Sequence, residues 1–121
     1  LVAEAGLLVT RVELRKDKTL YLNDGVYGGL IEAAKWAGEF AFPVACIPQD
    51  GSSVAPETAL LPFRFCGPTC DSLDMMKGPF ELPENIHEGD WVLVGMNGAY
   101  SNACRTDFNG FGQNKFISVD F

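Results

Sequence analysis

The sequence predicts an all-β domain, built as a Greek-key-like barrel or a sandwich. Short apolar segments recur along the chain and alternate with turns that contain Gly, Pro, Asn and Asp, which is typical of such folds. Only two short segments favour a helix. A chain of 121 residues, 47% of them hydrophobic and 21% charged, is long enough for one domain with a single core.

The first strands are predicted near the start of the chain. Residues 7–15 begin as a solid apolar run and then alternate, which is the pattern of a strand buried at one end and half-exposed at the other. A polar turn at residues 16–18 leads into a second strand at 19–22, so a hairpin is expected. Residues 1–3 also have a strand-like composition, and we therefore expect the chain to start inside a longer gene product.

The middle of the chain alternates between loops and strands. Residues 30–37 favour a short helix, and a prolonged strand competes with it. Residues 42–47 predict a strand, and Pro43 places it at a sheet edge or a strand start. Residues 49–57, rich in Gly, Ser and Pro, predict an exposed loop, and residues 58–65 predict the next strand.

The last third predicts shorter elements. Residues 75–79 are expected to form a turn and residues 80–83 a short extended piece. The β-prone run at 91–94 predicts a strand, with Trp91 in the core. One helical turn at 101–105, a turn at 108–111 and a final strand at 115–120 complete the prediction, without repeats or a second domain.

Charge and cysteine content narrow the classes of function. The formal net charge is -7 with only nine Lys and Arg, whereas nucleic-acid and anionic-membrane surfaces need clustered cations. No apolar run approaches the ~18 residues of a membrane-spanning helix. Four cysteines are few for a disulfide scaffold, and the C-x3-C spacing of Cys66 and Cys70 does not match zinc sites. We expect a cytoplasmic protein with reduced cysteines, no metal, no nucleic-acid partner and no membrane.

The stretch from Cys66 to Asp74 is the main candidate for chemistry. Its Gly-Pro pair ends the preceding strand, so Cys70 is expected on a loop held by a rigid element. A thiol displayed in this way, followed by the carboxylates of Asp71 and Asp74, suits a proton donor beside a cation-binding group. The alternative is that Cys70 is a small buried apolar residue, as most free cysteines are.

Three separated stretches resemble one known family. They are Tyr-Leu-Asn-Asp-Gly-Val-Tyr-Gly at 21–28, Gly-Pro-Thr-Cys-Asp-Ser-Leu-Asp at 67–74, and Gly-Ala-Tyr at 98–100 with Phe-Asn-Gly-Phe at 108–111. In order and rough spacing they are similar to the C-terminal part of the ornithine/diaminopimelate/arginine decarboxylases, which are pyridoxal-phosphate enzymes of the alanine-racemase fold type. The likeness extends from about Leu1 to Phe121. The Cys-Asp-x-Leu-Asp form resembles the ornithine or lysine/ornithine branch.

The resemblance implies that residues 1–121 are the C-terminal β-barrel domain of a two-domain decarboxylase. In this family a β/α barrel binds pyridoxal phosphate through a lysine, and the β-domain follows that barrel. Two subunits form a homodimer, and each active site is built across the interface. The chain contains neither the β/α barrel nor its lysine, so the isolated domain is expected to be inactive.

The resemblance also implies roles for four residues. Cys70 corresponds to the catalytic cysteine lent to the partner subunit's site, where its thiol protonates the α-carbon after carbon dioxide leaves. Asp71 corresponds to the carboxylate that binds the distal ammonium of a small basic amino acid, ornithine or lysine, in polyamine synthesis. Tyr100 corresponds to a tyrosine whose hydroxyl contacts the cofactor phosphate, and Tyr27 to an interface tyrosine near the same cleft.

Alternatives to this interpretation stay open. One is a non-catalytic regulatory paralogue that forms mixed dimers, and another is a decarboxylase of diaminopimelate, arginine or a carboxylated polyamine. A second substrate-binding carboxylate of the ornithine enzymes has no clear counterpart here. Residues 35–37 fall near its place, and Glu32 or Glu39 replaces it only if the alignment shifts.

Other polar and sulfur-containing residues receive structural interpretations. Asp24 is expected to form a turn, and Asp74 to brace its loop by accepting backbone N–H bonds. His87 is expected on a polar surface turn without a chemical role. The remaining cysteines, which are Cys46, Cys66 and Cys104, are interpreted as packing residues.

Overall fold

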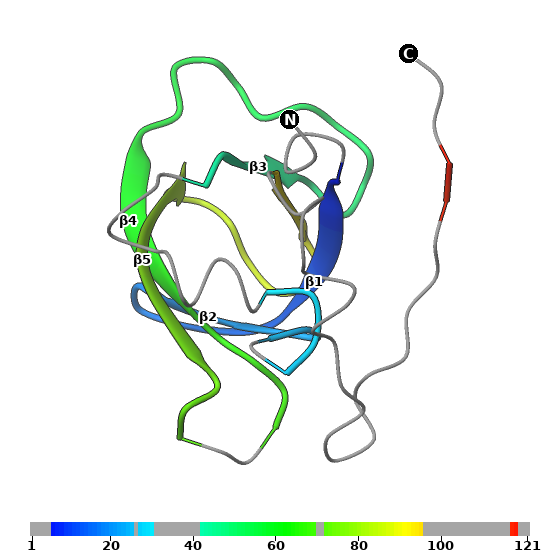
Figure 1. Cartoon of the computed structure of the whole chain (residues 1–121). Coiled ribbons are helices and arrows are strands. Elements are labelled where there is room, and N and C mark those ends of the chain that lie inside the picture. The colour runs from blue at the N-terminus through cyan, green and yellow to red at the C-terminus, as the bar shows by residue number, and fades with distance from the viewer. Residues whose placement is uncertain (1–5, 26, 31–41, 70–71, 96–116, 119–121) are drawn as a thin grey trace.

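The computed structural model describes residues 6–25, 27–30, 42–69, 72–95 and 117–118. Within these residues the chain forms six strands and no helix, and the sheet curls into a half-barrel (Figure 1). The strands are β1 (Leu8–Lys16), β2 (Thr19–Leu22), β3 (Val44–Ile47), β4 (Leu60–Cys66), β5 (Met75–Pro83) and β6 (Trp91–Val94). The predicted all-β fold is therefore confirmed.

The six strands form one mixed sheet in the order β3-β6-β1-β2-β4-β5. Four of the pairs are antiparallel, and β2 pairs with β4 in parallel. β1 connects the two halves, because its first residues pair with β6 and its last residues pair with β2. The outermost strands, β3 and β5, also contact each other, so the sheet curls around its core.

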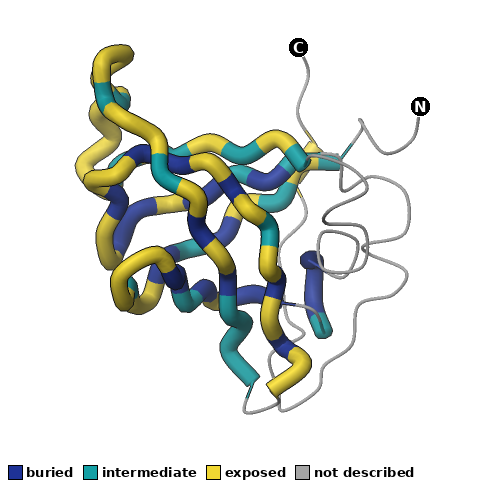
Figure 2. Tube along the Cα trace, turned by 90° about the vertical axis from the view of Figure 1, so that its left-hand side faces the viewer, coloured by how far each residue is buried: buried dark blue, intermediate teal, exposed yellow. Residues whose placement is uncertain are grey.

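Alternate side chains of the strands fill the interior. Buried and exposed residues follow one another along the strands, as the tube in Figure 2 shows. Phe65 of β4 and Phe80 of β5 stack at the centre, with ring centroids 4.0 Å apart. The other buried hydrophobic side chains come from β1, β2, β4, β5, β6 and the loops: Val12, Leu20, Leu22, Leu30, Phe63, Met76, Leu82, Ile86, Val92 and Val94.

A bulge in β1 changes which residues face inward. Val12 pairs with Leu22 and Leu14 pairs with Tyr21, so β1 carries one residue more than β2 between these pairs. Leu14 is exposed as a result, although alternation from Val12 predicts it inside. Arg15 instead turns toward the barrel end, where its guanidinium lies 5.0 Å from the centroid of the Phe63 ring.

The turn predicted at residues 75–79 is wrong, because these residues belong to β5. Phe80 pairs with Phe63 and Met76 pairs with Phe65, so β5 advances four residues where β4 advances two. The extra residues form a bulge opposite Arg64. β5 stands at the end of the strand order, so it is an edge strand. An edge strand with a bulge tolerates Pro79, which has no backbone N–H to donate.

Several side chains at the β1–β6 side are more exposed than predicted. Trp91 retains 37% exposure rather than lying in the core, because β6 presents Val92 and Val94 to the interior and Trp91 to the other face. Leu7 and Val9 are also exposed, although the apolar run of residues 7–9 predicts burial. The 49–57 loop is mostly exposed, as predicted, and arches over the top of the view in Figure 1.

Some predicted elements lie wholly or largely outside the described residues. They are the helix at 30–37 beyond Leu30, the helical turn at 101–105, the turn at 108–111 and the strand at 115–120 apart from residues 117–118. Two predicted strands begin slightly later than expected, at Val44 and Leu60. In the described part of the chain, no helix has the length and apolarity needed to cross a bilayer.

Candidate active-site loop

The loop between β4 and β5 carries the Cys-Gly-Pro-Thr-Cys-Asp motif. Cys66 at the end of β4 pairs with Met75 at the start of β5. One step further, the Gly67 N–H donates to the Asp74 carbonyl oxygen at 2.9 Å and closes the base of the loop. The two ends of the loop, at Gly67 and Asp74, are therefore held together by the hydrogen bonds of β4 and β5.

Asp74 braces this loop from inside. Its side chain is only 2% exposed, and its Oδ2 atom accepts hydrogen bonds from the Thr69 backbone N–H at 3.1 Å and from the Thr69 hydroxyl at 2.7 Å. A buried carboxylate that receives two donors is well satisfied, and removing it leaves those donors without their partner. The predicted bracing role of Asp74 is confirmed, and it fixes the residue directly before Cys70.

Two glycines let a second segment approach the loop closely. A Cβ atom on Gly25 would overlap Asp74 Oδ1 and would lie 2.7 Å from the Cα of Gly67. A Cβ atom on Gly67 would also overlap the Asp74 carboxylate. Any side chain at either position would therefore push the two segments apart. The Asn-Asp-Gly and Cys-Gly-Pro stretches, about forty residues apart in the sequence, thus meet at Asp74.

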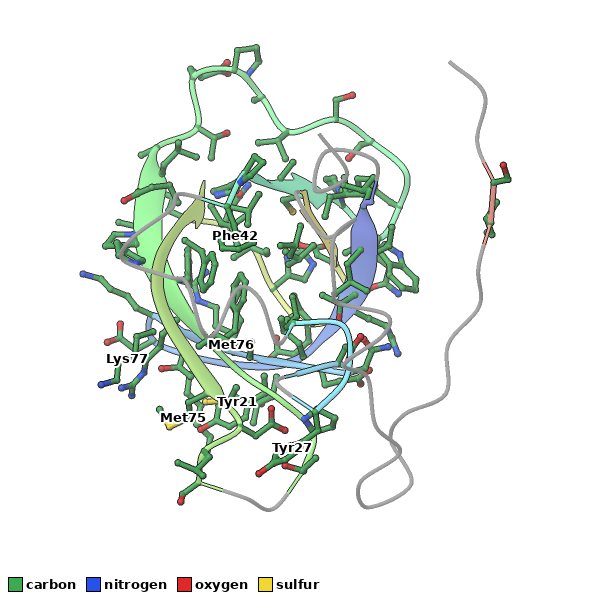
Figure 3. All side chains as sticks on the ribbon, in the orientation of Figure 1. Tyr21, Tyr27, Phe42, Met75, Met76 and Lys77 are labelled. Carbon is green, nitrogen blue, oxygen red and sulfur yellow. The ribbon has the colours of Figure 1, made fainter. Side chains whose placement is uncertain are left out.

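Asp24 holds the second segment in its own turn. Its Oδ1 atom accepts hydrogen bonds from the Gly25 N–H at 2.8 Å and the Gly29 N–H at 3.0 Å. The Gly25 carbonyl in turn accepts from the N–H groups of Gly28 and Leu30, both at 3.0 Å. The predicted turn-forming role of Asp24 is confirmed. This turn carries Tyr27, which is half-buried and lies at the lower end of the barrel in Figure 3.

The structure brings together two of the three motifs singled out in the sequence. Tyr27 belongs to the first motif, and the ends of the Cys66–Asp74 loop belong to the second. Cys70, Asp71 and Tyr100 lie outside the described residues, so their roles stay predictions. The same holds for Cys104 and for the third motif at 98–100 and 108–111.

The chemistry of the described cysteines agrees with packing roles. Burial raises the pKa of the half-buried Cys66 thiol, Arg64 opposes this shift, and Asp74 adds to it. Burial, reinforced by Asp90, raises the pKa of Cys46 to about 11. Both thiols therefore remain protonated near neutral pH. The described residues contain no cluster of three His, Cys, Asp or Glu side chains that could hold a metal ion.

Two structural features, one in this site and one elsewhere in the barrel, were not identified from the sequence. One is the close packing of Gly25 against Gly67, because a glycine in a turn does not reveal which segment it approaches. The other is Arg15, whose Nη1 atom donates to the Glu84 and Ile86 carbonyls and ties β1 to the loop after β5. A basic residue in an alternating strand otherwise indicates only an exposed face.

Residues 1–98 match the family described as pyridoxal-dependent decarboxylase, C-terminal sheet domain. The chain belongs to this family. Over 101 residues it is 38% identical to antizyme inhibitor 2 of Xenopus laevis, covering 84% of this chain and 21% of that protein. Over 104 residues it is 35% identical to ornithine decarboxylase of Schizosaccharomyces pombe, covering 83% of this chain and 23% of that protein. The chain thus spans less than a quarter of the length of these relatives.

Solved structures of the family show the same fold. The lysine/ornithine decarboxylase of Vibrio vulnificus complexed with putrescine superposes with a TM-score of 0.72 at 30% identity, over 98% of this chain and 31% of that chain. The arginine decarboxylase of Paramecium bursaria Chlorella virus bound to agmatine superposes with a TM-score of 0.74 at 28% identity, over 93% and 30% of the two chains. Family membership therefore rests on sequence and on fold.

Proposed function

We propose that this chain is the C-terminal sheet domain of a pyridoxal-phosphate-dependent decarboxylase of a basic amino acid, with ornithine as the first candidate substrate. The family match over residues 1–98 and the relatives named ornithine decarboxylase support this proposal. Structures of related enzymes hold putrescine, cadaverine or agmatine, which are all amines with a distal cationic group. Decarboxylation of ornithine yields putrescine, so the proposal includes a place in polyamine synthesis.

The observation that carries the proposal is the bracing of Thr69 by the buried carboxylate of Asp74. Thr69 precedes the Cys70-Asp71 pair, and Ser72 follows it two residues before Asp74. A functional pair that lies between Thr69 and the buried Asp74 that binds it would be supported close to the strand ends rather than by a long loop. We propose that this loop enters the active site of a partner subunit, in a homodimer with shared sites.

The residue types in the loop suit this chemistry. Bound pyridoxal phosphate would supply the electron sink for the carbanion left after decarboxylation. A thiol with a reference pKa of ~8.5 is mostly protonated near neutrality, so Cys70 would hold the proton that is delivered to the substrate α-carbon. The Asp71 carboxylate would bind the substrate's distal ammonium. Breaking such a buried charge pair costs roughly 2–5 kcal/mol, which disfavours substrates without that amine.

Two tyrosines would complete the site. The Tyr100 hydroxyl would contact the cofactor phosphate, and Tyr27, on the turn held by Asp24, would line the same cleft. The described contacts support Tyr27 most directly, since Asp24 fixes its turn and Gly25 packs against the loop base.

The test is a decarboxylation assay on the complete protein with pyridoxal phosphate. Release of carbon dioxide from L-ornithine, L-lysine, L-arginine and diaminopimelate would be compared, and we expect ornithine to give the highest kcat/KM. Cys70→Ala should lower product formation at least about 100-fold, as expected for loss of a positioned acid, and leave cofactor absorbance unchanged. Cys66→Ala is the matched control and should retain activity. Equal loss of cofactor binding and turnover in Cys70→Ala would remove the proton-donor role.

A second candidate function is that of a non-catalytic regulatory paralogue. One observation favours it: antizyme inhibitor 2 of Xenopus laevis is 38% identical over 84% of this chain, much like the 35% identity over 83% of the chain for the ornithine decarboxylase of Schizosaccharomyces pombe. The assay separates the two candidates. A complete protein that decarboxylates none of the four substrates, yet forms mixed dimers with an active decarboxylase, would support the regulatory function. We expect the 121-residue chain alone to release no carbon dioxide in either case.

A further inference from the structure

A pocket of about 330 Å³ lies where the β1–β2 turn meets β4 and the bulge of β5. Its lining includes Lys18 and Thr19 from the turn and the start of β2, Arg64 from β4, and Lys77 with Pro79 from β5. Arg64 and Lys77 are exposed, whereas their neighbours Phe63, Phe65 and Met76 face the core. Figure 3 shows Lys77 pointing away from the barrel.

The guanidinium of Arg64 is held in a defined orientation. β2 and β4 run in parallel here, with Thr19 paired to Arg64. The backbone N–H of Arg64 donates to the Lys18 carbonyl at 3.0 Å. The Arg64 Nε atom donates to the Thr19 hydroxyl at 2.7 Å. Within the described residues, the two terminal nitrogens of this guanidinium make no hydrogen bond, so they remain available as a planar pair of donors.

The positive charges of the pocket form no ion pair with the residues that the structure describes. In the described ranges, Lys18, Arg64 and Lys77 form no ion pair, although the chain carries a net charge of -7. Asp17 is the single carboxylate among the lining residues, against three cations. Three like charges gathered on strands and a tight turn repel one another, and a bound anion would relieve that repulsion.

We propose that this pocket binds an oxyanion, either a phosphate or a carboxylate group. The terminal nitrogens of Arg64 would bind two of its oxygens, and Lys18 and Lys77 would contribute point charges from either side. The pocket is open to solvent, which allows the oxyanion to belong to a larger molecule. This inference is independent of the decarboxylase proposal, because it uses none of the residues assigned to catalysis.

The test is site-resolved acylation of lysines in the complete protein as purified. An N-hydroxysuccinimide ester would be applied while inorganic phosphate replaces sodium chloride at constant ionic strength, and each lysine would be followed by peptide mass spectrometry. We expect saturable protection of Lys18 and Lys77, with rates lowered at least about threefold. Lys16, which lies over the Tyr21 ring and outside the lining, should be protected much less.

Variants and a second probe complete the design. Arg64→Gln should weaken the apparent affinity for phosphate about tenfold, whereas Arg11→Gln, on the same sheet and outside the pocket, should not change it. Because Arg64 also bonds Thr19, Lys77→Gln provides a variant that leaves that bond intact. Succinate in place of phosphate identifies the preferred oxyanion. Protection that does not saturate, that is equal at Lys16, or that persists in both Arg64→Gln and Lys77→Gln would overturn the proposal.

Discussion

Asp74 and Asp90 perform the same structural task in two regions of the barrel. Asp74 is 2% exposed and accepts two hydrogen bonds from Thr69. Asp90 is 3% exposed and accepts hydrogen bonds from the backbone N–H groups of Gln49 at 2.9 Å and His87 at 3.1 Å. Each buried carboxylate thus holds a loop or turn that lies outside the paired strands.

The difference between the two regions lies in what each loop carries. Asp74 holds the residue before Cys70-Asp71, whereas Asp90 joins the start of the 49–57 loop to the turn before β6. His87 stays exposed on that turn, with Nδ1 3.2 Å from Asp90 Oδ2. The same kind of anchor therefore supports the proposed functional loop in one region and connects strands in the other. Substitution of the two aspartates should separate these effects.

The largest expected effect is on turnover. In an active complete enzyme, Asp74→Ala should lower kcat about 10- to 100-fold, because a misplaced catalytic group costs rate even when it is present. Asp90→Ala is the matched control and should keep kcat within about twofold in the folded fraction. Steady-state kinetics with L-ornithine measure both. If both variants lose the same share of kcat, the distinction between the two regions fails.

A slightly smaller effect is expected from the glycine that packs against Asp74. Gly67→Ala should destabilise the protein by about 1–3 kcal/mol, because the added Cβ overlaps the Asp74 carboxylate in a closed site. Gly51→Ala is the comparison: its φ of +79° is strained for alanine, yet no atom lies within 4 Å of the added Cβ. We expect about 1 kcal/mol there, and a loss larger than that in Gly67→Ala. Urea unfolding measures both, and equal losses would contradict the close packing.

Asp90→Ala should cost about 1–2 kcal/mol of stability. It leaves the N–H groups of Gln49 and His87 without their acceptor, and water replaces part of each hydrogen bond because this region is partly exposed. Thermal unfolding of the variant measures the loss. Asp90→Asn, which keeps an acceptor oxygen, is the control and should recover part of the stability. A neutral Asp90→Ala would show that the anchor is dispensable.

The smallest expected effect concerns Cys46, whose pKa is raised to about 11 by burial and by Asp90. Its alkylation by iodoacetamide should be slow at pH 8 and should rise steeply toward pH 11. The contribution of Cys46 to stability should be constant below about pH 9 and should fall between 9 and 11, because the unfolded thiol loses its proton first. Asp90→Asn should speed alkylation modestly, since burial is the larger cause. Peptide-resolved mass spectrometry checks this, and rapid labelling at pH 8 would refute it.

The sequence by itself determined the strands and the turn chemistry. Alternation predicted β1, and short apolar or β-prone runs between turns predicted β2, β4 and β6 to within a few residues. Asp24 in Asn-Asp-Gly and Asp74 after the Cys-Gly-Pro motif were correctly assigned to local bracing, because short carboxylates bond nearby backbone N–H groups. The motifs also indicated the family, which the match over residues 1–98 shows.

Only the tertiary structure decided which distant residues meet. The bulge in β1 exposes Leu14, and the bulge in β5 lets this strand continue past its Gly-Pro pair. A sequence period of two predicts neither bulge. The parallel pairing of β2 with β4 brought Lys18 beside Arg64, and the curled sheet set Gly25 against Gly67 around Asp74. Local sequence fixes backbone preference, but strand register and sheet closure depend on contacts between residues far apart in the chain.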